Sequence, residues 1–113
     1  MHELALCRSV VATAAAHADG RPVARVHLQV GHLRQVVPEA LDLAWRALTE
    51  GGALDGAELV VEAVPAVVRC RGCGAATTLE WPVLACGSCD SRDVELVSGE
   101  ELLVVAIDVT VVA

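Results

Sequence analysis

Two closely spaced cysteine pairs constrain this 113-residue chain more than any other feature. Cys70 and Cys73 form the first CxxC pair, and Cys86 and Cys89 form the second. A CxxC turn brings two sulfurs to the same ion, and zinc binds four thiolates tetrahedrally at about 2.3 Å. The spacing therefore predicts a single zinc site made of all four cysteines. Gly74 directly follows the first pair, and we expect it to adopt the positive φ that glycine tolerates.

The predicted zinc site has a structural role, because four protein ligands leave no open coordination position. The surrounding segment, residues 69–93, contains few bulky apolar side chains. Because it cannot form a sufficient core of its own, we expect it to need the metal in order to fold. A rubredoxin-like iron centre would use the same four ligands, and the sequence does not separate it from zinc. Two disulfides are disfavoured, because we find no convincing export signal.

Hydrophobic periodicity outside the cysteine segment predicts two helices and three strands. Apolar residues at helical spacing predict a helix over residues 3–18, with Cys7 packed on its buried face. A second helix begins near Pro38, a residue suited to the first helical turn, and buries Trp45. Alternating apolar residues predict three strands, at residues 23–31, 57–64 and 101–112.

These elements predict an α+β fold, in which a three-stranded sheet and two helices form a two-layer α/β core. We expect residues 1–68 and 94–113 to form this core. Residues 69–93 form a zinc-binding ribbon insert between two strands of the same sheet. The core is aliphatic, because 55% of the residues are hydrophobic but the chain contains neither Phe nor Tyr.

Charge and composition exclude several classes of function. The formal net charge of −7 argues against a nucleic-acid partner, because proteins that bind nucleic acid present a basic face to the phosphates. The apolar run from Leu102 to Ala113 is about half a membrane span and contains Asp108, so we expect no membrane insertion. The sequence has no nucleophile–base constellation, phosphate-binding loop or acid–base dyad. We therefore expect a cytoplasmic protein that is not an enzyme.

The first three residues, Met1-His2-Glu3, form a second candidate metal site. His2 is not a small residue, so we expect the initiator Met1 to be retained. The α-amine, a neighbouring backbone amide and the imidazole then form chelate rings that suit square-planar Ni(II) or Cu(II). Taken alone this motif is a weak signal, because any peptide with a histidine near its start has some of this ability.

Four motifs occur together along the chain: Met1-His2-Glu3-Leu4 with Cys7, the segment 26–31 followed by a helix, the paired CxxC motifs, and the segment 98–102 before the last strand. In this combination the chain resembles the HypA/HybF family, the nickel-insertion accessory proteins of NiFe-hydrogenase maturation. The resemblance covers essentially the whole chain. The start motif is short, but its pairing with a late CxxC…CxxC is specific.

The resemblance implies a nickel metallochaperone. It implies that nickel binds at the N-terminus, with His2 supplying its imidazole and Met1 and Glu3 supplying main-chain nitrogen. The implied metals are structural Zn²⁺ in the cysteine module and Ni²⁺ as cargo. The implied partners are a HypB-type GTPase and the NiFe-hydrogenase large-subunit precursor, which receives the nickel.

Two other functions would use the same residues differently. A zinc-ribbon adaptor would dock proteins without delivering metal, and its N-terminus would have no role. A small redox iron protein would hold iron in the tetracysteine site and would be red when oxidised, whereas a zinc protein is colourless. Binding of one equivalent of Ni(II) at the α-amine separates a metallochaperone from an adaptor.

Overall fold

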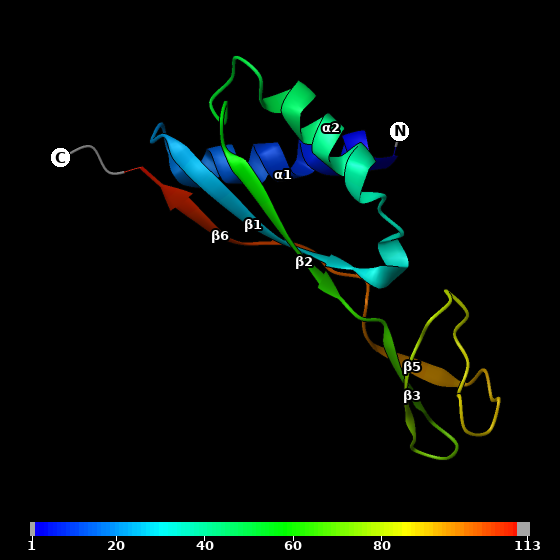
Figure 1. The fold of residues 1–113 in the computed structure, drawn as a ribbon. Coiled ribbons are helices and arrows are strands. Elements are labelled where there is room, and N and C mark those ends of the chain that lie inside the picture. Colours follow the sequence, from blue (N-terminus) through cyan, green and yellow to red (C-terminus); the bar gives the residue numbers. More distant parts are fainter. Residues whose placement is uncertain (1, 111–113) are drawn as a thin grey trace. The chain divides into compact units, whose positions relative to one another are not determined.

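The computed structural model describes residues 2–110, which divide into two units (Figure 1). The first, called the helical unit, comprises the described residues of 1–29, 36–62 and 103–113. The second, called the cysteine unit, comprises residues 30–35 and 63–102. The cysteine unit is thus formed largely by one continuous stretch of chain that interrupts the sequence of the helical unit.

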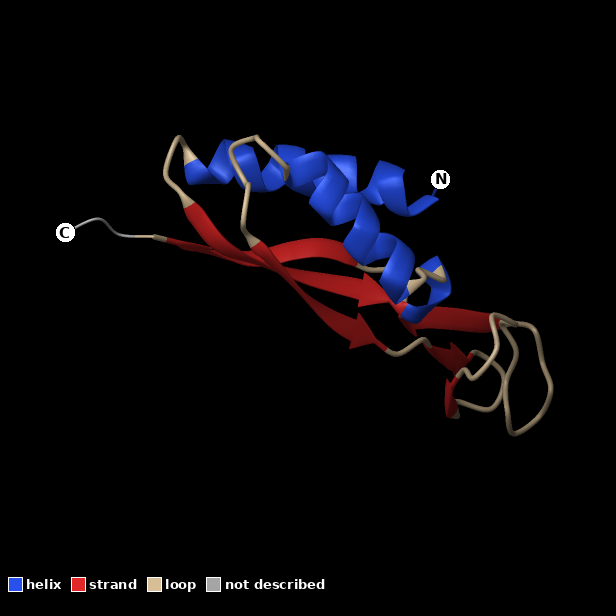
Figure 2. Ribbon diagram, turned by 45° about the horizontal axis from the view of Figure 1, so that its top comes forward, coloured by secondary structure: helices blue, strands red, loops and turns tan. Residues whose placement is uncertain are grey.

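Two helices and a three-stranded sheet make up two layers, as predicted from the sequence. The sheet has the strand order β2-β1-β6, and the helices lie on one of its faces (Figure 2). None of the described helices is long and apolar enough to span a membrane. The elements are α1 (His2–Ala18), β1 (Val23–Gly31), the 3₁₀ helix η1 (His32–Arg34), α2 (Pro38–Thr49), β2 (Glu58–Val64) and β6 (Leu102–Val109).

The core of the helical unit lies between the helices and the sheet. Val26 and Leu28 alternate with polar residues along β1 and are almost completely buried. The predicted burial of Trp45 is confirmed; its indole N–H also donates a hydrogen bond of 2.8 Å to the carbonyl of Ala57. The apolar residues that α1 and α2 bury against this layer are Leu6, Cys7, Val10, Ala14, Ala18, Leu41 and Ala44.

The opposite face of this sheet carries a polar network. Asp108 of β6 accepts hydrogen bonds from Arg25 at 3.3 Å and pairs with His27 Nε2 at 2.9 Å. Arg25 also forms a 3.4 Å ion pair with Glu58. The pairing of His27 holds the pKa of Asp108 below its ordinary value, with a further contribution from Arg25. His27 is therefore a partly buried member of this network. Its alternating position in the strand did not predict the contact with Asp108.

The cysteine unit contains a second small sheet that the sequence did not reveal. Strands β3 (Val67–Cys70), β4 (Ala76–Thr78) and β5 (Val94–Ser98) form it in the order β4-β3-β5. Both neighbours of β3 are antiparallel to it. Its buried cluster is small and consists of Ala66, Val68 and Leu79. The strands have at most five residues, which is too short for a clear alternation of apolar side chains.

Two glycines allow backbone segments of the cysteine unit to approach closely. Gly99 has a φ of 118°, and a Cβ there would lie 2.6 Å from Ala66 Cα. A Cβ on Gly31 would collide with the main chain of Gly99. The N–H of Leu33 donates to the Gly99 carbonyl at 2.9 Å, so this crossing is also hydrogen-bonded. Larger residues at either glycine would force these segments apart.

The packing of the helical unit predicts a clear contrast between two leucines. Leu28→Ala removes a side chain that is 1% exposed, and we expect it to lower the free energy of unfolding by about 2–5 kcal/mol. Leu43→Ala is the matched control, because Leu43 is 68% exposed on α2 and should change stability by less than about 0.5 kcal/mol. Urea unfolding of both variants measures the difference. Equal losses would contradict the assignment of the core.

Candidate metal centres

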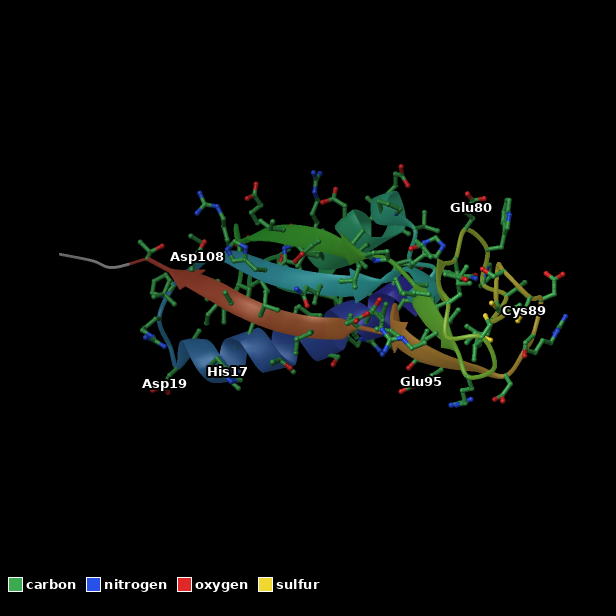
Figure 3. All side chains as sticks on the ribbon, turned by 90° about the horizontal axis from the view of Figure 1, so that it is seen from below. His17, Asp19, Glu80, Cys89, Glu95 and Asp108 are labelled. Atoms are coloured by element: carbon green, nitrogen blue, oxygen red, sulfur yellow. The ribbon has the colours of Figure 1, made fainter. Side chains whose placement is uncertain are left out.

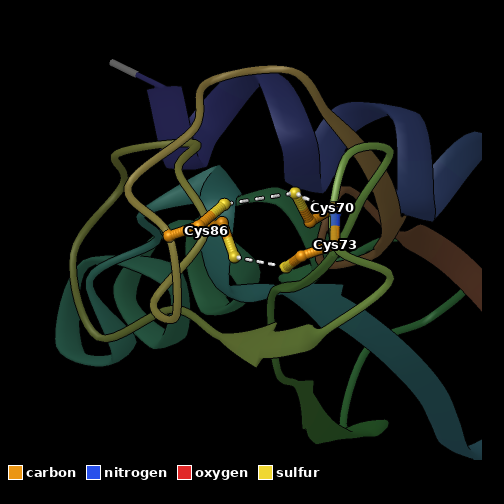
Figure 4. Close-up of side chains that lie close together, drawn as sticks. Cys70, Cys73 and Cys86 are labelled. Carbon is orange, nitrogen blue, oxygen red and sulfur yellow. Dashed lines mark hydrogen bonds between the residues drawn. The ribbon is translucent and has the colours of Figure 1, made fainter.

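The four paired cysteines direct their sulfurs toward one point of the cysteine unit (Figure 4). Cys70 Sγ lies 3.6 Å from Cys89 Sγ, and Cys73 Sγ lies 3.6 Å from Cys86 Sγ. All four sulfurs lie within 4.8 Å of one another, and all are free thiols. Sulfurs that share a tetrahedral zinc with 2.3 Å bonds stand about 3.8 Å apart. This group, called the cysteine cluster, therefore fits a single metal ion.

The first CxxC turn is shaped by its own backbone. The N–H of Gly74 donates to the carbonyl of Cys70 at 3.0 Å, and the N–H of Cys70 donates to the carbonyl of Ala75 at 2.9 Å. The N–H of Cys73 points at Cys70 Sγ from 3.4 Å. Gly74 has a φ of 77°, so the predicted need for a positive φ after the pair is confirmed.

The second CxxC turn repeats the two backbone hydrogen bonds of the first. The N–H of Asp90 donates to the carbonyl of Cys86 at 3.0 Å, and the N–H of Cys86 donates to the carbonyl of Ser91 at 2.8 Å. The N–H of Ser88 approaches Cys86 Sγ at 3.3 Å. Asp90 takes the position equivalent to the glycine of the first turn and has a φ of 61°, which aspartate tolerates better than most residues. Two equivalent turns thus present two pairs of sulfurs.

Backbone amides and neighbouring sulfurs shift the pKa values of these thiols in opposite directions. The N–H of Cys89 makes the largest contribution to lowering the pKa of Cys86, which falls to about 6. The pKa of Cys70 is lowered chiefly by the N–H of Cys73. The Ser91 amide has a lowering effect on Cys89, but the neighbouring sulfurs of Cys70 and Cys86 outweigh it and raise the pKa of Cys89 to about 12. A cation that binds all four sulfurs therefore displaces protons.

Thr77 of β4 supports the second turn from outside the cluster. Its Oγ1 accepts a 3.0 Å hydrogen bond from the N–H of Gly87, which lies between the two cysteines of that turn. A Cβ on Gly87 would lie 3.1 Å from Thr77 Cγ2, so glycine permits this approach. This contact was not predicted, since nothing in the sequence indicates that β4 packs against the second CxxC turn.

The second candidate site lies at the start of α1. Met1 lies outside the described residues, whereas His2 is exposed at the first position of the helix and Glu3 follows in the first turn. The N–H groups of a first helical turn donate to no carbonyl of their own helix. Backbone nitrogens at this end therefore lie outside the hydrogen-bond ladder of the helix.

The side chain of Glu3 has a structural contact of its own. Its carboxylate accepts a 3.2 Å hydrogen bond from the N–H of Val37, the N-cap residue of α2, which supplies no side-chain cap itself. This bond is the main reason that the pKa of Glu3 lies below its ordinary value. Glu3 thus ties the start of α1 to the start of α2. The two partners are 34 positions apart, so no local sequence pattern could indicate the contact.

The fifth cysteine belongs to the core, as predicted. Cys7 is 1% exposed, and its Sγ lies 3.7 Å from the carbonyl oxygen of Leu41. Burial raises the pKa of its thiol. Cys7 is therefore a packed, protonated side chain and not a member of the cysteine cluster.

Comparison with known proteins identifies relatives along nearly the whole chain. The family model "HypA: Hydrogenase/urease nickel incorporation, metallochaperone, hypA" matches residues 1–109. A hydrogenase maturation factor HypA from Geotalea uraniireducens is 40% identical over 109 residues, which cover 96% of this chain and 99% of the relative. The hydrogenase maturation factor HypA of Chloroflexus aurantiacus is 41% identical over 112 residues, which cover 96% of this chain and 98% of the relative.

Solved structures share the fold. The solution structure of the Ni metallochaperone HypA from Helicobacter pylori matches with a TM-score of 0.68 at 18% identity, over 96% of this chain and 97% of that one. A second HypA solution structure matches with a TM-score of 0.68 at 19% identity and covers 97% of both chains. Because the family model and relatives at about 40% identity span almost the entire sequence, the chain belongs to the HypA family of hydrogenase/urease nickel-incorporation metallochaperones.

Proposed function

We propose that this protein binds Ni(II) at its N-terminus and delivers it during maturation of NiFe-hydrogenase, while zinc stabilises the cysteine unit. The observation that carries the proposal is a tetracysteine cluster and an N-terminal Met-His-Glu in a chain that matches the HypA family model over residues 1–109. Nickel then belongs to the helical unit and zinc to the cysteine unit, whose residues 63–102 extend on both sides of the ribbon bounds 69–93 expected from the sequence. The protein acts as a carrier in the cytoplasm and has no catalytic role.

Zinc is the metal that best suits the cysteine cluster. Four thiolates form a soft donor set, and the 3.6 Å spacing between sulfurs is close to the edge of a zinc tetrahedron. All four positions are taken by protein ligands, so this metal would neither exchange readily nor activate a substrate. Iron would accept the same ligands. A redox role, however, would leave the nickel-type N-terminus and the helical unit unexplained.

Nickel suits the N-terminus for different reasons. The His2 imidazole, together with the backbone nitrogens of Met1, His2 and Glu3, offers the nitrogen donors that square-planar Ni(II) prefers. A site at the exposed end of a helix is open to a receiving protein, which helps a carrier to release its cargo. Copper binds such donors more strongly than nickel on the Irving–Williams order. Selectivity therefore comes from metal availability and from partner contacts.

The proposed partners follow from the same family relationship. A HypB-type GTPase cooperates in nickel handling, and the NiFe-hydrogenase large-subunit precursor receives the ion. The chain is acidic, with a net charge of −7, and no nucleic-acid or membrane partner is proposed. Transfer within a protein complex preserves the selectivity that free release of the ion would lose.

One observation favours the alternative of a docking adaptor. Trp81, Val83 and Leu84 of the cysteine unit are 74%, 51% and 45% exposed, and exposed apolar groups of this size often mark contact surfaces. An adaptor would use this surface without carrying nickel. Nickel binding to the untagged protein distinguishes the two functions.

The zinc proposal predicts that the fold of the cysteine unit depends on the metal. We expect about one zinc per chain, and Cys73→Ala should abolish zinc binding and make residues 63–102 sensitive to protease. The helical unit should keep its helical circular dichroism, since its core is separate. Cys7→Ala is the matched control, because it removes a buried thiol and should leave the zinc content unchanged. A metal-free, reduced protein that keeps a protease-resistant cysteine unit would falsify the proposal.

The nickel proposal predicts that tight Ni(II) binding depends on the N-terminal residues alone. His2→Ala, or residues added ahead of Met1, should abolish tight Ni(II) binding in a calorimetric titration, because each removes a terminal donor. Zinc content should not change. His17→Ala is the control, since His17 is also exposed on α1 but lies in its last turn. If both N-terminal variants give the same titration curve as the wild type, nickel does not bind at the N-terminus and this proposal is wrong.

The partner proposal predicts what accompanies the protein in its native cell. Capture through a C-terminal tag, which leaves Met1 free, should recover a GTPase and a hydrogenase large-subunit precursor, as identified by mass spectrometry. Deletion of the gene should lower nickel-enzyme activity, and added nickel should restore part of it. If neither partner is recovered and the deletion strain keeps full activity, the adaptor function takes the place of the chaperone.

A further inference from the structure

The two CxxC turns are attached to the β4-β3-β5 sheet in different ways. Cys70 is the last residue of β3, so the first turn continues directly from a strand. The next residue is held as well, because the N–H of Arg71 donates to the carbonyl of Asp93 at 3.0 Å. The second turn belongs to no strand, and Figure 3 shows Cys89 on a loop that extends beyond the sheet. The sheet therefore fixes the first pair of sulfurs, whereas the second pair needs a separate contact.

One hydrogen bond supplies this contact. Over residues 80–91, all of which the structure describes, the N–H of Gly87 is the one group apart from the cysteine sulfurs with a hydrogen bond to a strand of this sheet. The acceptor is Thr77 Oγ1 of β4, 3.0 Å away. Gly87 directly follows Cys86, whose Sγ lies 3.6 Å from Cys73 Sγ. The bond therefore holds the backbone beside a sulfur that must meet the first pair.

The strand pairing determines where the Thr77 hydroxyl lies. Thr77 is opposite Val68 in the antiparallel pairing of β4 with β3, so the two side chains are on the same face of the sheet. Val68 is fully buried on that face, and Thr77 is half-buried beside it. The hydroxyl thus belongs to a strand that is paired with the strand of Cys70.

The glycine at position 87 is fitted to Thr77. Gly87 is not among the residues with a positive φ, so its backbone conformation is open to other residues. The three heavy atoms nearest to a Cβ at this position all belong to Thr77: Cγ2 at 3.1 Å, Oγ1 at 3.3 Å and Cβ at 3.8 Å. Glycine therefore serves the close approach of the second turn to Thr77.

We propose that Thr77 is a positioning residue for the cysteine cluster, which holds the second pair of sulfurs against the first and so slows the release of the bound metal. The inference rests on the proposed role of zinc in this cluster. Thr77 does not touch the metal, because its hydroxyl acts on the backbone next to Cys86. Outer contacts of this kind keep metal ligands in place, and their loss weakens metal binding by about 10- to 100-fold.

Release of zinc from the zinc-loaded full chain to an excess of a coloured chelator tests this role. Thr77→Val removes the acceptor of the Gly87 N–H, and we expect zinc to leave about tenfold faster. Thr77→Ser keeps the hydroxyl and should release zinc at nearly the wild-type rate. Thr78→Val is the matched control, because it makes the same change at the next residue of β4, whose side chain is on the opposite face. Circular dichroism and a starting content of about one zinc per chain verify that each variant is folded and loaded.

A double variant tests the fit between the two residues and does not require Thr77→Val to fold. Gly87→Ala should also speed the release of zinc, because the new Cβ would press on Thr77 Cγ2. Thr77→Ser removes that methyl group. Zinc should therefore leave the double variant Thr77→Ser/Gly87→Ala more slowly than it leaves Gly87→Ala.

Three results would overturn the inference while zinc itself stays in place. These are a wild-type release rate in Thr77→Val, an acceleration by Thr77→Ser or Thr78→Val equal to that by Thr77→Val, and a double variant that is no slower than Gly87→Ala. A wild type that holds no zinc would refute the proposed zinc role itself, and this inference with it.

Discussion

The fold of the cysteine unit depends on four cysteine sulfurs that lie within 4.8 Å of one another and can share one metal ion. The buried cluster of this unit consists of Ala66, Val68 and Leu79. Each fully buried aliphatic side chain contributes about 1.5–3 kcal/mol, whereas binding of a structural zinc ion contributes about 10–16 kcal/mol. A cation in the cluster therefore outweighs the apolar core of this unit. It also removes the repulsion that four ionised thiolates would otherwise produce at this distance.

The helical unit differs from the cysteine unit in having a larger aliphatic core. Its helices cover one face of the β2-β1-β6 sheet, and Trp45 fills part of that layer with its indole N–H satisfied. The same packing holds the start of α1 in place, since Glu3 bonds to the N-cap of α2. This separation would allow the N-terminus to gain and lose an ion while the cysteine unit keeps its own.

Much of this architecture could be predicted, because it depends on local patterns. The CxxC spacing predicted the cysteine cluster, and the residue after Cys73 was correctly expected to need a positive φ. The positive φ of Asp90 was not predicted: Asp90 follows the second CxxC pair as Gly74 follows the first, but aspartate, unlike glycine, is not by itself a signal for a positive φ. The pairing of His27 with Asp108 spans 81 positions and depends on the register of the sheet. Strand β4 has three residues and exists because β3 lies beside it.

We propose that two metals are sorted by ligand type, with nickel on nitrogen at the N-terminus and zinc on sulfur in the cysteine cluster. X-ray absorption spectroscopy at both metal edges, on untagged protein loaded with one equivalent of Ni(II), tests this most directly. We expect a nickel spectrum of square-planar nitrogen donors without sulfur, and a zinc spectrum of four sulfurs at about 2.3 Å. Sulfur in the first shell of nickel, or displacement of zinc by nickel, would contradict it.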